Sequence, residues 1–433
     1  MSRVTRKALG GAGGARSGEF SQGFHRPALA LVATLSLVAG CTSSHPGAAR
    51  AGSTTQPRAP ATATTSTTVA RCSPIGVVEQ WPLRQRVMRL IVAPSLNFNL
   101  AQLTSVVAAG VGGVLFIGSA APPADLARLV AAAQAQPVAG VPVLTMADEE
   151  GGGIQRLNGL VGSFAWPRQL AADDSVAQVQ SLARTVGSQL RAAGVDMDLA
   201  QVLDVDGGAG PNNSDPDGSR SFSAVPSVAA NFGVAFMQGL SEGGELSVVK
   251  HFPGLGGSAG NSDAGPAHTV SYSTLQTSGI PPFAAAVAAG AKVVMVANDM
   301  VPGLTTAPAS VSSAVIQGLL RQQLGFQGVV ITDSLSAGAV TSAGYGVVSA
   351  AVAAVEADAD LVLFGSTLTS AATTALIPAE VASTVNGIAD ALVAAVQQGA
   401  LPENQLDASV LRVVDLTGVD LCAGGGGGVG GGA

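Results

Sequence analysis

The sequence predicts an α/β protein that folds as a single-domain (β/α)8 TIM barrel, and two observations predict it. Continuous apolar runs rich in Val, Ile and Leu alternate with alanine-rich helical stretches, a pattern typical of a parallel sheet covered on both faces. There are eight runs, the number that a barrel of about 350 residues requires. The expected strands are 89–93, 113–117, 142–147, 196–200, 246–250, 292–297, 328–333 and 361–365.

An open, doubly wound sheet is the alternative with the same strand pattern. No G-x-G-x-x-G motif follows the first run, which disfavours the dinucleotide-binding form of that sheet.

The composition disfavours one class of binding partner. The 433-residue chain has a net charge of −7, 11% charged residues and no basic stripe beyond its N-terminus, so we expect no nucleic-acid partner.

The N-terminal segment 1–40 is interpreted as a signal peptide. A basic stretch precedes the apolar run 27–41, which is shorter than the roughly 20 residues of a spanning helix. The run ends in Leu-Val-Ala-Gly-Cys, which resembles the lipobox of bacterial lipoproteins. By that resemblance Cys41 becomes the lipidated first residue, and the protein is exported and anchored to the outer face of the cell membrane. Ordinary secretory cleavage near Gly40 is the alternative.

The folded domain is expected at 72–422. Residues 41–71 are rich in Ser, Thr, Ala and Pro and cannot offset the entropy of ordering, so we interpret them as a tether, and 423–433 as a Gly-rich tail. Cys72 and Cys422 stand at the two edges of the domain. An exported compartment permits a disulfide between them, with free thiols as the alternative. Neither CxxC spacing nor partner histidines accompany them, so we expect no metal, and the lack of a phosphate loop predicts no cofactor.

A barrel carries its catalytic groups on the loops at the carboxyl ends of its strands. Polar side chains of this chain fall there: Asp148, Lys250 with His251, Asn298 with Asp299, and Asp333. One aspartate at such a junction can simply cap the next helix. Several that converge on one rim indicate a site.

Five motifs then occur in the order found in a known family: ADEEGGGIQRL (147–157), VLDVD (202–206), GSRSF (218–222), KHFPG (250–254) and VITDSLSAGAV (330–340). They resemble the signatures of glycoside hydrolase family 3, in its single-domain β-N-acetylhexosaminidase branch, over nearly all of 75–420. With a signal and tether, the chain is similar to the actinobacterial lipoproteins of that branch. The resemblance implies a retaining hydrolase of N-acetyl-β-glucosaminide bonds in cell-wall-type glycans. We expect the protein to be a monomer.

The resemblance also implies residue roles. Asp333 matches the nucleophile, because a carboxylate must attack the anomeric carbon and leave when water arrives; capping a helix near Ser334 is its alternative role. The matching substrate-binding positions are Asp148, Arg156, Arg220, Lys250, His251 and Asn298, although the family has His at the last. A buried Lys250 needs a partner, so we expect Asp148 or Asp333 beside it. A purely structural salt-bridge cluster is the alternative.

The loop after KHFPG departs from the family pattern. The family has Asp-Ser-His there, whose Asp and His form the acid/base dyad; this chain has Asn261, Ser262 and Asp263. Three interpretations stay open. Asp263, with a pKa raised by Asp333, protonates the leaving oxygen; His268 moves in instead; or the acid is lost.

The loss of the acid would leave a catalytically weakened or inactive glycan-binding lipoprotein on the same barrel. A different alternative is a barrel aldolase that uses Lys250 as its Schiff-base nucleophile. The motifs KHFPG and ITDSL disfavour that chemistry, because together they fit glycoside hydrolysis.

Overall fold

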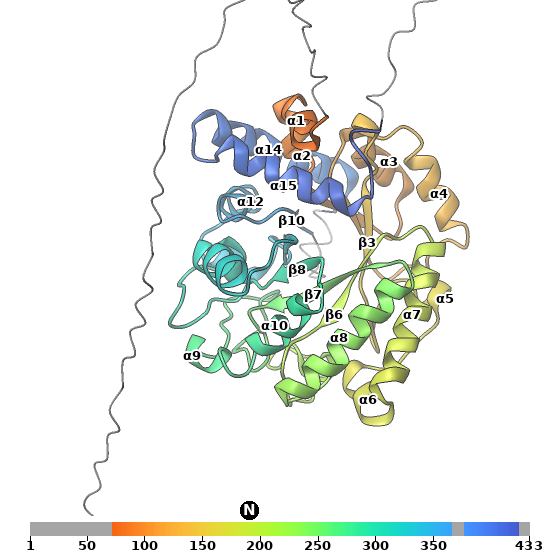
Figure 1. Cartoon of the computed structure of the whole chain (residues 1–433), viewed down its shortest axis with the longest axis vertical. Coiled ribbons are helices and arrows are strands. Elements are labelled where there is room, and N and C mark those ends of the chain that lie inside the picture. Colours follow the sequence, from red (N-terminus) through yellow and green to blue (C-terminus); the bar gives the residue numbers. More distant parts are fainter. Residues whose placement is uncertain (1–71, 366–375, 424–433) are drawn as a thin grey trace, which may run out of the picture. The chain divides into compact units, whose positions relative to one another are not determined.

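Eight parallel strands form one sheet in the computed structural model, which describes residues 72–365 and 376–423 (Figure 1). Each strand falls on one of the eight predicted runs, so that prediction is confirmed. The strands are β1 (Ile91–Leu96), β2 (Gly113–Ile117), β3 (Leu144–Ala147), β6 (Met197–Val202), β7 (Leu246–Phe252), β8 (Val293–Val296), β9 (Val329–Thr332) and β10 (Val362–Leu363). The predicted signal peptide, Cys41, the tether 41–71 and the tail beyond residue 423 lie outside the described residues.

The sheet closes on itself. Its order is β10-β1-β2-β3-β6-β7-β8-β9, with β1 paired to β10 through Ile91 and Val362. A parallel bridge between Ile331 and Leu361 joins the two outer members, and Thr332 N donates to Leu361 O at 3.0 Å. Closure confirms the predicted barrel and excludes the open sheet.

Helices cover the outside of the sheet (Figure 1). Local sequence explains their ends: α7 begins at a capping box of Ser175 and Gln178, and α3 ends at Gly110, whose φ of 79° suits glycine. The α-helices are α1 (Pro74–Glu79), α2 (Leu83–Met88), α3 (Leu100–Ala109), α4 (Leu126–Ala133), α5 (Asn158–Val161), α6 (Pro167–Asp173), α7 (Val176–Ala192), α8 (Pro226–Glu242), α9 (Tyr272–Leu275), α10 (Ile280–Ala288), α11 (Gly338–Ser342), α12 (Val347–Glu356), α14 (Pro378–Gln397) and α15 (Glu403–Leu416).

Helix α14 is long and apolar enough to cross a membrane by length and composition, with 20 residues and a mean hydropathy of 1.3. In the structure it packs against α2, α12 and β1. Its residues Val381, Ile388 and Leu392 are buried. These contacts make α14 part of the barrel wall.

A disulfide joins the two edges of the domain. Cys72 lies just before α1 and Cys422 just after α15, and these two helices pack together. The two Cα atoms are 5.7 Å apart, within the range that a disulfide spans. The bond closes a loop of 350 residues, which restricts the unfolded chain.

We expect the double variant Cys72→Ala/Cys422→Ala to lower the free energy of unfolding by about 2–5 kcal/mol, because the unfolded chain regains its loop entropy. Urea denaturation of the oxidised protein and the variant measures the difference. Wild-type protein in reductant should match the variant. Equal urea midpoints for all three would contradict the prediction.

Candidate active site

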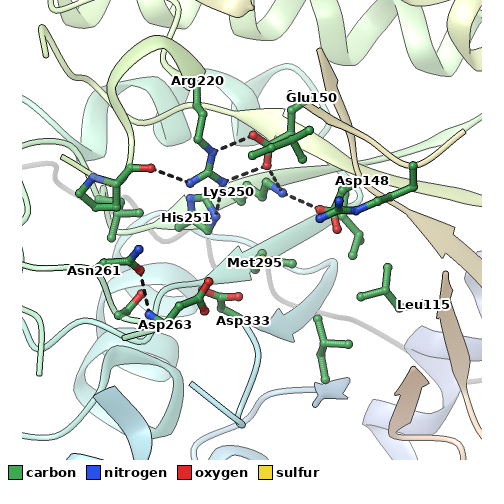
Figure 2. A pocket seen from close by; sticks show the side chains of 17 residues that line it. Leu115, Asp148, Glu150, Arg220, Lys250, His251, Asn261, Asp263, Met295 and Asp333 are labelled. Carbon is green, nitrogen blue, oxygen red and sulfur yellow. Dashed lines mark hydrogen bonds and ion pairs between the residues drawn. The ribbon is translucent and has the colours of Figure 1, made fainter. Parts of the chain in front are cut away.

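A cavity of about 150 Å³ opens where the strands end, and it gathers seven of the predicted site residues (Figure 2). Apolar side chains from four strands, β2, β6, β8 and β10, share its lining: Leu115, Leu199, Met295 and Leu363. The predicted polar residues in it are Asp148, Arg156, Arg220, Lys250, His251, Asp263 and Asp333. The barrel therefore brings most of the polar residues predicted at strand ends into one cavity.

Asp333 follows β9 directly, and its backbone is tied to the neighbouring strand because Asp333 N donates to Val296 O at 2.9 Å. Its Oδ1 accepts a bond from Ser334 N at 2.6 Å. The next helix, α11, begins only at Gly338 and has Ala337 as its N-cap. Asp333 is thus not the cap of that helix, and its carboxylate faces the cavity (Figure 2).

A buried carboxylate in the lining of the cavity pairs with two cations (Figure 2). Glu150, on the short strand β4 (Glu149–Gly151), accepts from Arg220 Nε at 2.8 Å and pairs with Lys250 Nζ at 2.6 Å. Lys250 Nζ also lies 2.9 Å from Asp148 Oδ1, which confirms the expected pairing with that residue. Sequence reasoning missed Glu150, although it stands inside the first motif.

Electrostatics keeps these groups charged. Burial alone would raise the pKa of Glu150, but Arg220 and Lys250 outweigh it and hold that pKa well below its usual range. Burial would lower the pKa of Lys250, and Asp148 with Glu150 instead raises it. A fixed array of charges like this can bind several hydroxyl groups of a sugar at once.

We expect Glu150→Ala to lower the free energy of unfolding by about 3–5 kcal/mol, because two buried cations lose their shared partner. Chemical denaturation measures this loss. Glu403 is the control: it pairs with Arg86 at 2.6 Å, but its side chain is 59% exposed, so Glu403→Ala should cost less than about 1 kcal/mol. If both variants lost a similarly small amount of unfolding free energy, Glu150 would not be needed to stabilise the two buried cations.

Asp204 orients His251. Its Oδ2 lies 2.7 Å from His251 Nδ1, and it also accepts from the backbone N of His251 at 3.1 Å. The Nδ1 proton is therefore directed at Asp204, which leaves Nε2 facing Arg220 Nη2 at 3.4 Å. Asp204 is fully buried just beyond β6 and was not predicted as a site residue, although the motif VLDVD contains it.

The altered loop brings Asp263 into the cavity together with Asp333 (Figure 2). Asn261 lines it too, and its Oδ1 accepts from Asp263 N at 2.9 Å. Loss of solvation, followed by repulsion from Asp333, raises the pKa of Asp263 to about 6. Asp263 lines the cavity, and as a whole residue it is exposed to solvent.

Two predicted residues are not brought to the cavity lining. His268 is exposed, and its backbone forms bridges with Ala259 and Met300. Asn298 is fully buried behind the rim; it donates from Nδ2 to Ser334 O at 2.6 Å and accepts from Ser310 Oγ at 2.6 Å. Asn298 therefore supports the backbone that follows Asp333.

Among the described residues, no three His, Cys, Asp or Glu side chains are grouped so as to hold a metal.

Residues 82–416 match the glycosyl hydrolase family 3 N terminal domain. The chain belongs to this family. It is 35% identical over 410 residues to the β-hexosaminidase LpqI of Mycobacterium tuberculosis, an alignment that covers 91% of this chain and 98% of that protein. The predicted family is confirmed.

Solved structures of two similar proteins share the fold. The structure of M. tuberculosis LpqI matches with a TM-score of 0.71 and 32% identity over 81% of this chain and 98% of that one. The β-N-acetylhexosaminidase from Beutenbergia cavernae matches with a TM-score of 0.68 and 30% identity over 78% of this chain and 99% of that one. These matches agree with the closed barrel of this chain.

Proposed function

We propose that this family 3 protein is a retaining glycosidase that hydrolyses N-acetyl-β-glucosaminide bonds, with Asp333 as nucleophile and Asp263 as acid/base. The observation that carries the proposal is that the two carboxylates share one cavity with a charged, sugar-binding array. The sugar is inferred from the relatives, which are named as a β-hexosaminidase and a β-N-acetylhexosaminidase.

The two carboxylates would divide the reaction between them. Asp333 attacks the anomeric carbon while the protonated Asp263 gives its proton to the departing oxygen, and the bond between the sugars breaks. Ionised Asp263 then takes a proton from water as the water oxygen attacks the anomeric carbon, and the bond from that carbon to Asp333 breaks. The negative charge of Asp333 disfavours ionisation of Asp263, so Asp263 keeps the proton that it donates in the first step.

The rest of the cavity would hold the sugar. Asp148 and Lys250 pair with one another and present oxygens and N–H donors toward the same space. Arg156 and Arg220 line it as well, and Asp204 fixes the ring of His251. We carry these substrate contacts over from the family, one matching position at a time.

We also propose that the enzyme is exported, is anchored to the outer face of the membrane through Cys41 and acts as a monomer on cell-wall-type glycans. The lipobox-like run ending at Cys41 and the tether 41–71 support the anchor. Radiolabelled fatty acid should be incorporated into the full chain in its host. Incorporation that persists in Cys41→Ala would refute this site.

The proposed activity is tested with the full chain and an aryl N-acetyl-β-glucosaminide that has an activated leaving group. Such a substrate needs little help from an acid, so Asp333 suffices to release the aryl alcohol. We expect turnover, with the first-formed sugar in the β configuration by NMR. Measurable binding without a burst or turnover would overturn the enzyme proposal.

That contrary result would favour the second candidate, a catalytically weakened glycan-binding protein. The observation behind it is the altered dyad: Asn261 replaces the first acid, and His268 lies outside the cavity lining. Binding of N-acetylglucosamine oligosaccharides by calorimetry, without hydrolysis over days, is its expected signature.

A further inference from the structure

The base of the loop that carries Asp263 is fixed to the barrel. Leu255 N donates to Asp204 Oδ1 at 2.6 Å, and Gly257 N donates to Asp206 Oδ2 at 2.8 Å. Ser258 Oγ donates to the buried carboxylate of Asp299 just beyond β8. Three interactions with strand-end segments therefore set where the loop starts.

The tip of the loop, residues 261–265, is held differently. Asn261 O accepts from the backbone N of Ala264 and of Gly265, which folds the tip into a tight turn. In residues 72–365 and 376–423, two hydrogen bonds tie this turn to another part of the barrel. Gly338 N donates to Asp263 O at 3.1 Å, and Ala339 N donates to Ser262 O at 2.8 Å.

These two donors, Gly338 and Ala339, are the first residues of α11, and we call them the docking seat. They follow Asp333 by five and six residues along the chain. One short segment thus carries the nucleophile at its start and receives the acid loop at its end. The position of Asp263 relative to Asp333 depends on this contact.

Gly338 touches the tip so closely that a side chain would not fit. A Cβ atom there would lie 2.6 Å from Ala264 C and from Gly265 N, which are backbone atoms that cannot turn aside. The backbone of Gly338 is not in the left-handed region that favours glycine. Its lack of a side chain therefore serves the contact with the loop.

We propose that Gly338 is a positioning residue: it lets the tip of the acid loop dock on α11 and so places Asp263 in the cavity with Asp333. The inference rests on the proposed function, in which Asp263 is the acid. A methyl group at Gly338 pushes the tip away and withdraws the acid, while Asp333 and the sugar-binding array stay in place.

The variant Gly338→Ala tests this against the matched control Gly265→Ala, since a Cβ atom on Gly265 meets nothing within 4 Å. We expect Gly338→Ala to lower kcat/KM on an unactivated N-acetylglucosamine disaccharide by about tenfold or more, part of the 10²–10⁴ that an acid contributes. Its kcat/KM on the activated aryl substrate, which reports the first step only, should stay within about threefold. Gly265→Ala should change neither rate. Equal losses on both substrates would overturn the proposal.

A second readout does not depend on catalysis. Hydrogen exchange followed by mass spectrometry should show faster exchange of the amides of 261–265 in Gly338→Ala than in wild type, and no change in Gly265→Ala. Unchanged exchange in Gly338→Ala would refute the docking seat. If wild type turned over neither substrate, the proposed function would fail, yet the exchange comparison would still decide whether the seat holds the loop.

Discussion

Asp333→Asn is expected to lower kcat/KM by at least about 10³-fold on activated and unactivated glycosides alike, because no glycosyl–enzyme bond can form. The amide has the shape of the carboxylate, and its oxygen can still accept the bond from Ser334 N. Steady-state kinetics on both substrates measures the loss. Calorimetry should show that N-acetylglucosamine still binds.

Measuring binding beside turnover separates a loss of chemistry from misfolding. Binding that persists while turnover disappears assigns Asp333 to the chemistry, whereas joint loss assigns it to the structure. Activity of Asp333→Asn within tenfold of wild type would remove Asp333 from the nucleophile's role.

Asp263→Asn is expected to lower kcat/KM on the unactivated disaccharide by about 10²–10⁴-fold, the contribution of a positioned acid, and to leave the activated aryl substrate nearly unaffected. His268→Asn is the matched control, because that side chain lies on the same loop but outside the cavity lining. It should change neither rate. Selective loss in His268→Asn instead would move the acid's role to that residue.

The same assignment predicts a pH dependence. Asp263 must be protonated to act as the acid, and its pKa is raised to about 6, first by burial and then by Asp333. The disaccharide rate should therefore fall as the pH rises above about 6, since the acid form is progressively lost. This decline should be absent in Asp263→Asn. A wild-type rate that is constant from pH 5 to pH 8 would contradict the assignment.

The fold was predictable because its signal is local. Continuous Val, Ile and Leu runs mark strands that are buried on both faces, and alanine-rich segments mark the helices between them. The site was predictable in position for the same reason: Asp148, Lys250 and Asp333 stand at strand ends, and a closed parallel barrel brings all such ends to one rim.

What the sequence could not supply is the direction of each side chain. Glu149 and Glu150 are adjacent, yet Glu149 accepts from Leu157 N whereas Glu150 meets Lys250. The hairpin of β4 and β5 (Ile154–Gln155) decides which of the two enters the cavity. Asn298 is the opposite case, a predicted site residue that does not line the cavity. It stands at a strand end, but its amide bonds to Ser334 and Ser310.

Asp204 and Gly338 were missed because their roles depend on partners far along the chain. Asp204 is a buried acceptor whose importance appears only once His251 is placed against it, 47 residues later. Gly338 resembles any glycine at a helix start until the loop 261–265 is seen against it. For Asp204 the sequence offered one signal, an aspartate just beyond a strand in the motif VLDVD. For Gly338 it offered none.

Covalent trapping at Asp333 tests the central claim most directly. A 5-fluoro glycosyl fluoride of N-acetylglucosamine reacts as a substrate, but its glycosyl–enzyme bond hydrolyses slowly, so the sugar stays on the nucleophile. Peptide mass spectrometry of the treated full chain should find the added mass on the peptide that contains Asp333, and none in Asp333→Asn. Turnover of the aryl substrate with the label on a different residue, or with no labelled peptide, would contradict the account.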